Sequence, residues 1–365
     1  MDFAPSQEEV MLRDAARRYL AHDFAARRRG DEANGDARWR GYAELGWLAL
    51  LVPENAGGLG GAIEDVLILA EELGRALSHQ PYVTSGILAT RLVDLLAGGP
   101  QRLELLSAMM SGERRLAPAL YEPGRRYSLE PETCATTAGS GYLLSGAKCL
   151  IAGVPGTDAL LVSALLEDGS IGLFLVAIDY AAVAASHYAT IDDGCATDVR
   201  FEQVGLGPDA LLGITTVEAI DDVLDEARLA LCADALGALE RAVEMTADYL
   251  KTRTQFGQPL ASFQALQHSV VEIHIDADSI RSSLYHAIAA CHRGVREDRR
   301  RAVSSCWVKT FDAAKKIAGM AVHLHGGIGM TTEYPVGHIL RRVMVSERSL
   351  GDLEHHLARY MGRPG

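Results

Sequence analysis

The sequence lacks the patterns that would indicate a metal-stabilised, disulfide-stabilised or nucleic-acid-binding protein. Its six cysteines are scattered and no CxxC pair occurs, so we expect neither a metal site nor a disulfide framework, and a reducing cytoplasm fits best. Positive charge is also scarce: 35 Lys and Arg stand against 48 Asp and Glu, for a net charge of −13. Because a nucleic-acid partner requires clustered Lys and Arg, we expect none.

Long apolar runs are absent as well. A stretch such as residues 47–52 is far too short to cross a bilayer, so no membrane span is expected. The N-terminus, MDFAPSQEEV, is acidic and contains no apolar core, which argues against a signal peptide. Together these absences predict a cytoplasmic protein.

What the sequence does contain is a change of pattern along its length, which predicts an α+β protein of three domains. Residues 1–115 carry helical periodicity. Residues 116–215 alternate short runs of Val, Leu, Ile and Thr with Gly and Asp turns, as is typical of antiparallel strands in a sandwich or barrel. Residues 216–365 return to long helical patterns and indicate a helix bundle. No βαβ alternation occurs, which disfavours a Rossmann fold.

Single elements are also indicated. Ser6 and Glu9 form a capping-box pattern ahead of a first helix, and a glycine-rich break at 55–61 precedes a second. The basic run 293–301 contains two acids and suggests a solvated loop. The expected helices after the first cover 63–77, 85–96, 100–111, 217–252, 263–292 and 301–324, and the expected strands lie within 139–153, 158–166 and 170–178.

One motif of the last segment combines an arginine, an aromatic residue and a glycine. Arg253 offers a planar fork of donors that suits a pyrophosphate, Phe256 can pack on a flat ring, and Gly257 permits close approach of the backbone. The alternative is a helix C-terminus, with Arg253 favoured by the helix dipole and Gly257 as the cap.

A second motif is rich in glycine. Gly326, Gly327 and Gly329 let backbone N–H groups converge on an anion, with His323 close by as a donor. The alternative is an ordinary turn between helices. Gln264 is a weaker candidate, because an exposed glutamine on a helix is common.

Three strings in order carry a resemblance to a known family. They are ELGWLALLVPENAGGLG (44–60) with EELGRAL (71–77), then RTQFGQPLASFQALQH (253–268), then HLHGGIGMTTEYPV (323–336). The chain resembles the acyl-CoA dehydrogenase family over essentially its whole length. The resemblance implies FAD bound between two subunits and oxidation of an acyl-CoA thioester to the 2,3-enoyl-CoA. A carboxylate removes the proton next to the carbonyl, while flavin N5 accepts the hydride.

The resemblance also assigns residues to a neighbouring subunit's FAD. His323 stands where the family usually has Gln, and it can still donate a hydrogen bond. The expected cofactor-binding residues are Arg253, Phe256, Gly257, Gln264, His323, Gly326, Gly327 and Gly329.

The chain departs from the family where it would hold its own flavin. Tyr121 replaces a Thr, and residues 125–127 (Arg-Arg-Tyr) crowd a region that is normally small. Leu150 and Ala152 replace a Trp and a hydroxyl residue, and both suggest strand core. These losses together predict that the chain's own flavin face is vacant.

The family's base is missing too, so no catalytic residue is predicted. Leu350 and Ala227 occupy the two positions at which members carry it. Glu347, Glu226 and Asp352 lie near these positions, but each is more simply a solvated or ion-paired acid than a substitute base.

Residues for a partner's FAD are thus retained, whereas those for the chain's own flavin and substrate are lost. This division resembles the non-catalytic, β-type subunits of actinobacterial heteromeric α2β2 acyl-CoA dehydrogenases, several of which act on steroid side-chain CoA thioesters. It implies a second subunit carrying the catalytic Glu, an acyl-CoA substrate and an electron-transfer flavoprotein. The alternatives are a self-sufficient homotetrameric dehydrogenase with an unusual base and a non-enzymatic binding protein on the same fold.

Overall fold

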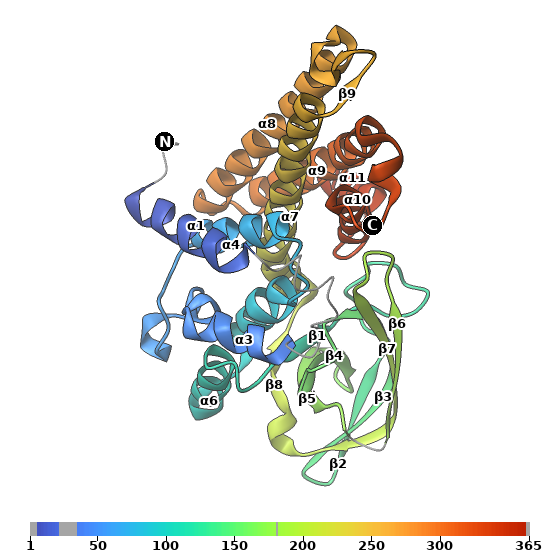
Figure 1. Cartoon of the computed structure of the whole chain (residues 1–365). Helices are drawn as coiled ribbons and strands as arrows, with labels where there is room; N and C mark the ends of the chain where they lie inside the picture. The colour runs from blue at the N-terminus through green and yellow to red at the C-terminus, as the bar shows by residue number, and fades with distance from the viewer. Residues whose placement is uncertain (1–5, 22–34, 180–181, 363–365) are drawn as a thin grey trace. The chain divides into compact units, whose positions relative to one another are not determined.

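The computed structural model describes residues 6–21, 35–179 and 182–362 (Figure 1). The chain divides into two compact units that interleave along the sequence. We call residues 33–66 and 79–227 the sheet unit, and residues 1–32, 67–78 and 228–365 the bundle unit. The three-domain division stays a prediction, and the N-terminus considered for a signal peptide lies partly outside the described residues. No described helix is long and apolar enough to cross a membrane.

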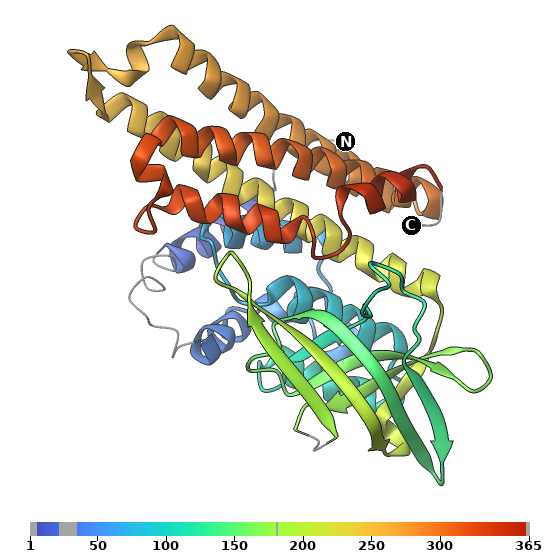
Figure 2. The same ribbon diagram turned by 90° about the vertical axis from the view of Figure 1, so that its right-hand side faces the viewer.

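The sheet unit is built on an eight-stranded sheet in the order β6-β7-β3-β2-β4-β5-β8, with β1 paired to β4 (Figures 1 and 2). Most neighbours are antiparallel, as predicted, but β4 runs parallel to both β1 and β2. The strands are β1 Leu116–Ala119, β2 Cys134–Ala138, β3 Gly141–Ala152, β4 Ala159–Leu166, β5 Ile171–Ala177, β6 Val183–Ala189, β7 Cys195–Leu206 and β8 Leu211–Thr215.

The core of this sheet contains one buried ion pair among apolar side chains such as Phe174 and Phe201. Lys148 Nζ lies 2.7 Å from Glu122 Oε1 and 3.0 Å from Ser163 Oγ. Burial lowers the pKa of Lys148 to about 8, although the Glu122 carboxylate opposes that shift. Removing one partner would leave a buried charge uncompensated, so the pair ties the 122 segment to β3.

Short helices precede and follow the glycine-rich break of the sheet unit. Gly58 has no room for a side chain, because a Cβ there would lie 2.1 Å from the carbonyl oxygen of Val52. The helix predicted over 85–96 begins earlier, at Tyr82, and its first part is a π-helix. The helices are α3 Gly35–Glu44, the π-helix Tyr82–Ala89, α5 Thr90–Leu96 and α6 Gly99–Met110, with 3-10 turns at Trp47–Ala49, Glu54–Ala56 and Pro208–Ala210.

Three long antiparallel helices dominate the bundle unit (Figure 2). They are α7 Val217–Thr252, α8 Gln264–His292 and α9 Arg296–His325, and α7 has the predicted bounds. Both α7 and α4 (Ile63–Arg75) begin within the sheet unit. The remaining helices of this unit are α1 Gln7–Leu20, α10 Pro335–Ser346 and α11 Leu353–Tyr360, and the predicted capping box of α1 is present.

Two glycines bring α4 and α7 into backbone contact. A Cβ at Gly74 would lie 1.8 Å from the Asp234 carbonyl oxygen, and one at Gly237 would lie 1.9 Å from that of Glu71. Because any side chain would push the helices apart, this contact explains the glycine of the EELGRAL string.

Buried acids of α4 bind arginines from other helices of the unit. The Glu71 carboxylate accepts hydrogen bonds from Arg281 of α8 at 2.9 and 3.1 Å. Glu72 accepts from Arg17 of α1 at 2.7 Å. These pairs hold α1 and α8 against α4.

The prediction of a loop over residues 293–301 was wrong. Only residues 293–295 connect α8 to α9, and the rest form the first turns of α9. Glu297 explains the difference, since it pairs with Arg300 and Arg301 at the i,i+3 and i,i+4 spacings that support a helix.

Candidate functional site

The arginine motif forms a hairpin at the end of α7. Arg253 directly follows the helix, and two short strands, β9 (Thr254–Gln255) and β10 (Gln258–Pro259), pair across a two-residue turn. Phe256 and Gly257 form that turn with φ of 53° and 78°, so it is of type I′. Gly257 therefore serves the hairpin, and the alternative of a helix-capping glycine was wrong.

Phe256 is placed where neither local conformation nor packing favours it. A bulky side chain at positive φ is strained, and this ring is 90% exposed. Its aromatic neighbour is Phe263, edge-on at 6.1 Å. The Arg253 and Gln264 side chains are exposed as well, and neither bonds to another described residue. The hairpin thus presents an aromatic ring and a guanidinium group to the exterior.

The glycine motif forms a 3-10 turn, Gly326–Met330, after α9. A Cβ at Gly326 or Gly327 would meet nothing, whereas one at Gly329 would lie 2.7 Å from the Val322 carbonyl oxygen. Gly329 is therefore required for packing, while the first two glycines and His323 face open space.

A stack of aromatic rings brings the two motifs together, and we did not predict it. His325 packs on Tyr249 of α7 with ring centroids 4.6 Å apart, and its Nε2 lies 3.2 Å from the Tyr334 hydroxyl. The hairpin and the glycine turn consequently lie at the same end of the bundle (Figure 2). The only signal in the sequence was that His325 directly precedes Gly326.

In the sheet unit, the segments that depart from the family pattern lie side by side. The Tyr121 carbonyl accepts a hydrogen bond from Cys149 N at 2.9 Å. The Tyr121 ring is buried, edge-on to Tyr127 at 5.6 Å. Arg125 turns toward Glu132, to which it is ion-paired. A buried phenol thus occupies the place of the expected threonine.

Leu150 is not strand core, contrary to our interpretation. A bulge between Lys148 and Ile151 interrupts the pairing of β3 with β7 and turns Leu150 outward, with φ of 56° and half of its surface exposed. Its N–H donates to Asp198 at 3.0 Å. Ala152 continues the strand half-buried, so neither position supplies an aromatic ring or a hydroxyl.

Both expected base positions are apolar and buried. Ala227 is fully buried on α7, and Leu350 is 5% exposed. The Leu350 carbonyl is held by Arg228 Nε at 3.3 Å and by His356 Nε2 at 3.2 Å. Neither side chain can accept a proton.

The three acids near these positions are engaged elsewhere. Glu226 accepts from Arg91 Nε at 2.7 Å. Glu347 is buried and lies 3.0 Å from Lys315 Nζ. Asp352 caps α11 by accepting from the His355 N–H at 2.8 Å.

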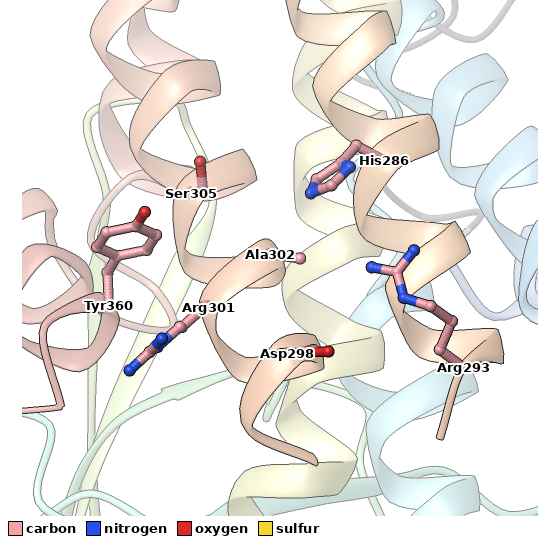
Figure 3. A pocket seen from close by; sticks show the side chains of 7 residues that line it. All are labelled: His286, Arg293, Asp298, Arg301, Ala302, Ser305 and Tyr360. Carbon is pink, nitrogen blue, oxygen red and sulfur yellow. The ribbon is translucent and has the colours of Figure 1, made fainter. Parts of the chain in front are cut away.

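Other features of the described chain offer no competing site. Among the described residues, no cluster of His, Cys, Asp or Glu could hold a metal ion. An open depression of about 330 Å³ lies between α8, α9 and α11. Figure 3 shows Arg293 to one side of Asp298, and Arg301 with Tyr360 to the other. The cationic groups therefore do not converge on one point.

Family models match both helical parts of the chain. The model of the acyl-CoA dehydrogenase N-terminal domain matches residues 6–113, and that of the acyl-CoA dehydrogenase C-terminal domain matches residues 217–362. The acyl-CoA dehydrogenase FadE27 of Mycobacterium tuberculosis is 31% identical over 329 residues, covering 88% of this chain and 86% of that protein.

Solved structures have the same fold over nearly the whole chain. A variant of the Tcur3481-Tcur3483 steroid ACAD is 30% identical with a TM-score of 0.85, covering 98% of this chain and 97% of that one. The ChsE4-ChsE5 complex of Mycobacterium tuberculosis is 26% identical with a TM-score of 0.88, covering 99% of this chain and 98% of that one. The chain belongs to the acyl-CoA dehydrogenase family, whose members are FAD-dependent oxidoreductases that dehydrogenate acyl-CoA. The predicted fold class is thereby confirmed.

Proposed function

We propose that this chain is the non-catalytic subunit of a heteromeric acyl-CoA dehydrogenase, and that it completes an FAD site whose base belongs to a partner subunit. The observation that carries the proposal is the contrast between two sets of residues. Leu350 and Ala227, at the base positions, are apolar and buried, whereas Arg253 and Phe256 are exposed and available to another molecule.

The residues at the hairpin end of the bundle fit FAD chemically. An exposed guanidinium that bonds to no other described residue suits the pyrophosphate, and an exposed ring at a hairpin tip suits a flat aromatic group. Gly326 and Gly327 leave the backbone open to an anion. When bound, FAD supplies the hydride acceptor; this chain's residues bind and orient it and move no proton.

The corresponding face of the sheet unit fits a flavin poorly. Tyr121 is buried against Tyr127, and Leu150 is turned outward by a bulge. Leu150 and Ala152 offer neither a ring nor a hydroxyl, and the Tyr121 hydroxyl is buried. This poor fit favours a subunit that contributes to a partner's FAD without holding one of its own.

Two of the similar structures support a heteromer. One is described as a complex of two proteins, and the other carries a paired name and is described as a steroid ACAD. We infer a partner of the same family that carries the catalytic Glu, an acyl-CoA substrate of the steroid side-chain class, and an electron-transfer flavoprotein as acceptor.

The test is to co-express this chain with a family member that carries the Glu, and to measure flavin per complex. Arg253→Ala should weaken FAD binding by about one to two orders of magnitude, because a charge-assisted hydrogen bond contributes roughly 1.5–3 kcal/mol. Arg293→Ala is the matched control: Arg293 is also exposed, but lies beyond the opposite end of α8.

A different pattern would make this chain the catalytic subunit. If Arg253→Ala retained full flavin while folded Glu347→Ala or Asp352→Ala complexes lost turnover, the proposal would be wrong. Each variant is first checked for a native circular dichroism spectrum, because Glu347 is buried and Asp352 caps a helix.

A further inference from the structure

His325 is a buried, hydrogen-bonded side chain to which the proposed function gives no role. It is the last residue of α9 and is 2% exposed, although the motifs on either side of it are open to solvent. Its ring lies nearly parallel to that of Tyr249, with an interplanar angle of 28°.

The hydrogen bonds of His325 determine its tautomer. Nδ1 lies 2.8 Å from the Ala321 carbonyl oxygen, which can only accept, so Nδ1 carries the proton. Burial lowers the pKa of His325 and favours the neutral ring, although backbone hydrogen bonds with Ala321 and Met245 oppose the shift. Nε2 is then an acceptor, and the Tyr334 hydroxyl donates to it across 3.2 Å. The ring is thus held by its hydrogen bonds to Ala321 and Tyr334 and by its stack on Tyr249.

The contacts of the His325 ring connect it to the hairpin, to the glycine turn and to the segment that precedes α10. The Tyr249 carbonyl accepts from Arg253 N at 2.8 Å, so the stacked residue is bonded to the first residue of the hairpin segment. A Cβ at Gly329 would lie 3.1 Å from that of His325, so the glycine turn packs directly on this residue. Tyr334 directly precedes α10, at the end of the segment that follows the turn.

We propose that His325 is a positioning residue that holds the Arg253 hairpin and the glycine turn in the relative placement that one FAD molecule requires. The inference rests on the proposed function, and it adds that the two motifs act as one unit through Tyr249, His325 and Tyr334. Phenylalanine could stack but not bond, and asparagine could bond but not stack, so an imidazole meets both requirements.

The experiment measures the dissociation constant of FAD by titrating the apo-complex of this chain with its partner. Tyr334→Phe removes one hydroxyl and should raise the dissociation constant of FAD about three- to tenfold, the range expected for one hydrogen bond. His325→Phe should raise the dissociation constant of FAD further. Tyr360→Phe, a matched change on α11, should have no effect. Unchanged FAD affinity in both Tyr334→Phe and His325→Phe would overturn the inference.

A double-mutant cycle separates positioning from general stabilisation. If the Tyr334 hydroxyl acts by placing Arg253, then Tyr334→Phe should cost less affinity in the Arg253→Ala background than in the parent complex. Purely additive losses would show that the hydroxyl acts independently of Arg253, and the inference would fail. Amide exchange of residues 254–260 should also accelerate in His325→Phe, and unchanged exchange would contradict the proposal.

The two proposals fail in different ways. Full flavin retention by Arg253→Ala would reject the subunit role. Loss of flavin in Arg253→Ala, with normal affinity in the His325 and Tyr334 variants, would reject only the positioning role. If His325→Phe fails to fold, the single-atom change Tyr334→Phe still decides the question.

Discussion

His356 shows how a single residue stabilises the turn at Leu350, one of the two expected base positions. Its imidazole is fully buried, stacks on Trp307 at 4.6 Å, and contacts the Leu350 carbonyl and the Ser304 hydroxyl. Desolvation, together with the nearby positive charge of Arg228, holds the pKa of His356 well below its usual 6.5. The folded chain therefore keeps this ring neutral.

The neutral ring predicts a pH dependence of stability. The pKa is depressed in the folded state, so below pH 6.5 the unfolded chain binds a proton that the folded chain does not. The free energy of unfolding should therefore fall as pH drops below 6.5. In His356→Gln the fall should be shallower by up to about 1.4 kcal/mol per pH unit.

The measurement is denaturant unfolding of the isolated chain between pH 7.5 and 5, values chosen to bracket roughly the free imidazole pKa. Because His325 also has a lowered pKa, part of the slope should remain in His356→Gln. His268→Gln is the control, since His268 is exposed on α8. Identical slopes for the parent and His356→Gln would show that this ring is not held neutral.

Residue types in a motif could be predicted better than their surroundings. Arg253 and Phe256 suit a cofactor by their chemistry alone, and both are exposed. The prediction that Leu150 lies in the strand core was wrong because a β-bulge shifts every later side chain to the other face. The position of such a bulge cannot be predicted from the periodicity of the sequence. His325 was missed because its partner rings lie on α7 and at the start of α10, and such contacts form only in the folded chain.

Among the elements, the β9–β10 hairpin combines a favourable turn geometry with an unfavourable residue. A type I′ turn requires positive φ at both central positions, and Asn-Gly is its preferred pair. Phe256-Gly257 satisfies only the second position. Retaining a strained, exposed aromatic ring there is expected where binding, rather than folding, determines the residue.

This conflict predicts opposite effects of one substitution. Phe256→Asn should leave stability unchanged or raise it by up to about 1 kcal/mol, because asparagine tolerates the left-handed conformation. The same change should weaken the binding of FAD to the complex, because packing on the ring is lost. This loss of affinity should depend little on salt concentration. Thermal unfolding and flavin titration are the two measurements, and a loss of stability together with unchanged flavin would contradict the account.

Element types and lengths followed from periodicity, while details of pairing did not. The bounds of α7 were predictable because 36 residues with one glycine and no proline leave few places to end a helix. The parallel pairing of β4 with β1 and β2 was not, because strand neighbours are set by the whole sheet. The start of α9 was misjudged because its Glu297–Arg301 pair resembles a solvated charged loop.

At the scale of the whole molecule, the chain combines the family fold with apolar, buried residues at both expected base positions. The close helix contact at Gly74 and the tight turn at Gly58, neither of which leaves room for a side chain, are present. At the positions expected for a base and for a flavin contact, Leu350 is buried and Tyr121 packs edge-on to Tyr127. A fold can be kept while its site changes, because activity resides in a few side chains on a shared scaffold.

The proposed subunit role predicts that the isolated chain binds little FAD. Tyr121 and the bulge at Leu150 remove flavin contacts of the sheet unit, and the exposed Arg253 hairpin alone offers too few contacts to hold the cofactor. The purified chain should therefore be colourless, and the complex with its partner should be yellow. The measurement is the ratio of flavin absorbance to protein for the chain alone, the partner alone and the mixture.

Each outcome of the flavin measurement supports a different function for this chain. Near-stoichiometric FAD in the isolated chain would establish a self-sufficient dehydrogenase, and one of Glu347, Glu226 or Asp352 would then have to leave its present partner to act as base. A colourless mixture with every Glu-bearing family partner tried would favour a binding protein on the same fold. We expect flavin to bind only after mixing and to be lost again with Arg253→Ala. Only a site at an interface between two chains requires both the partner and Arg253.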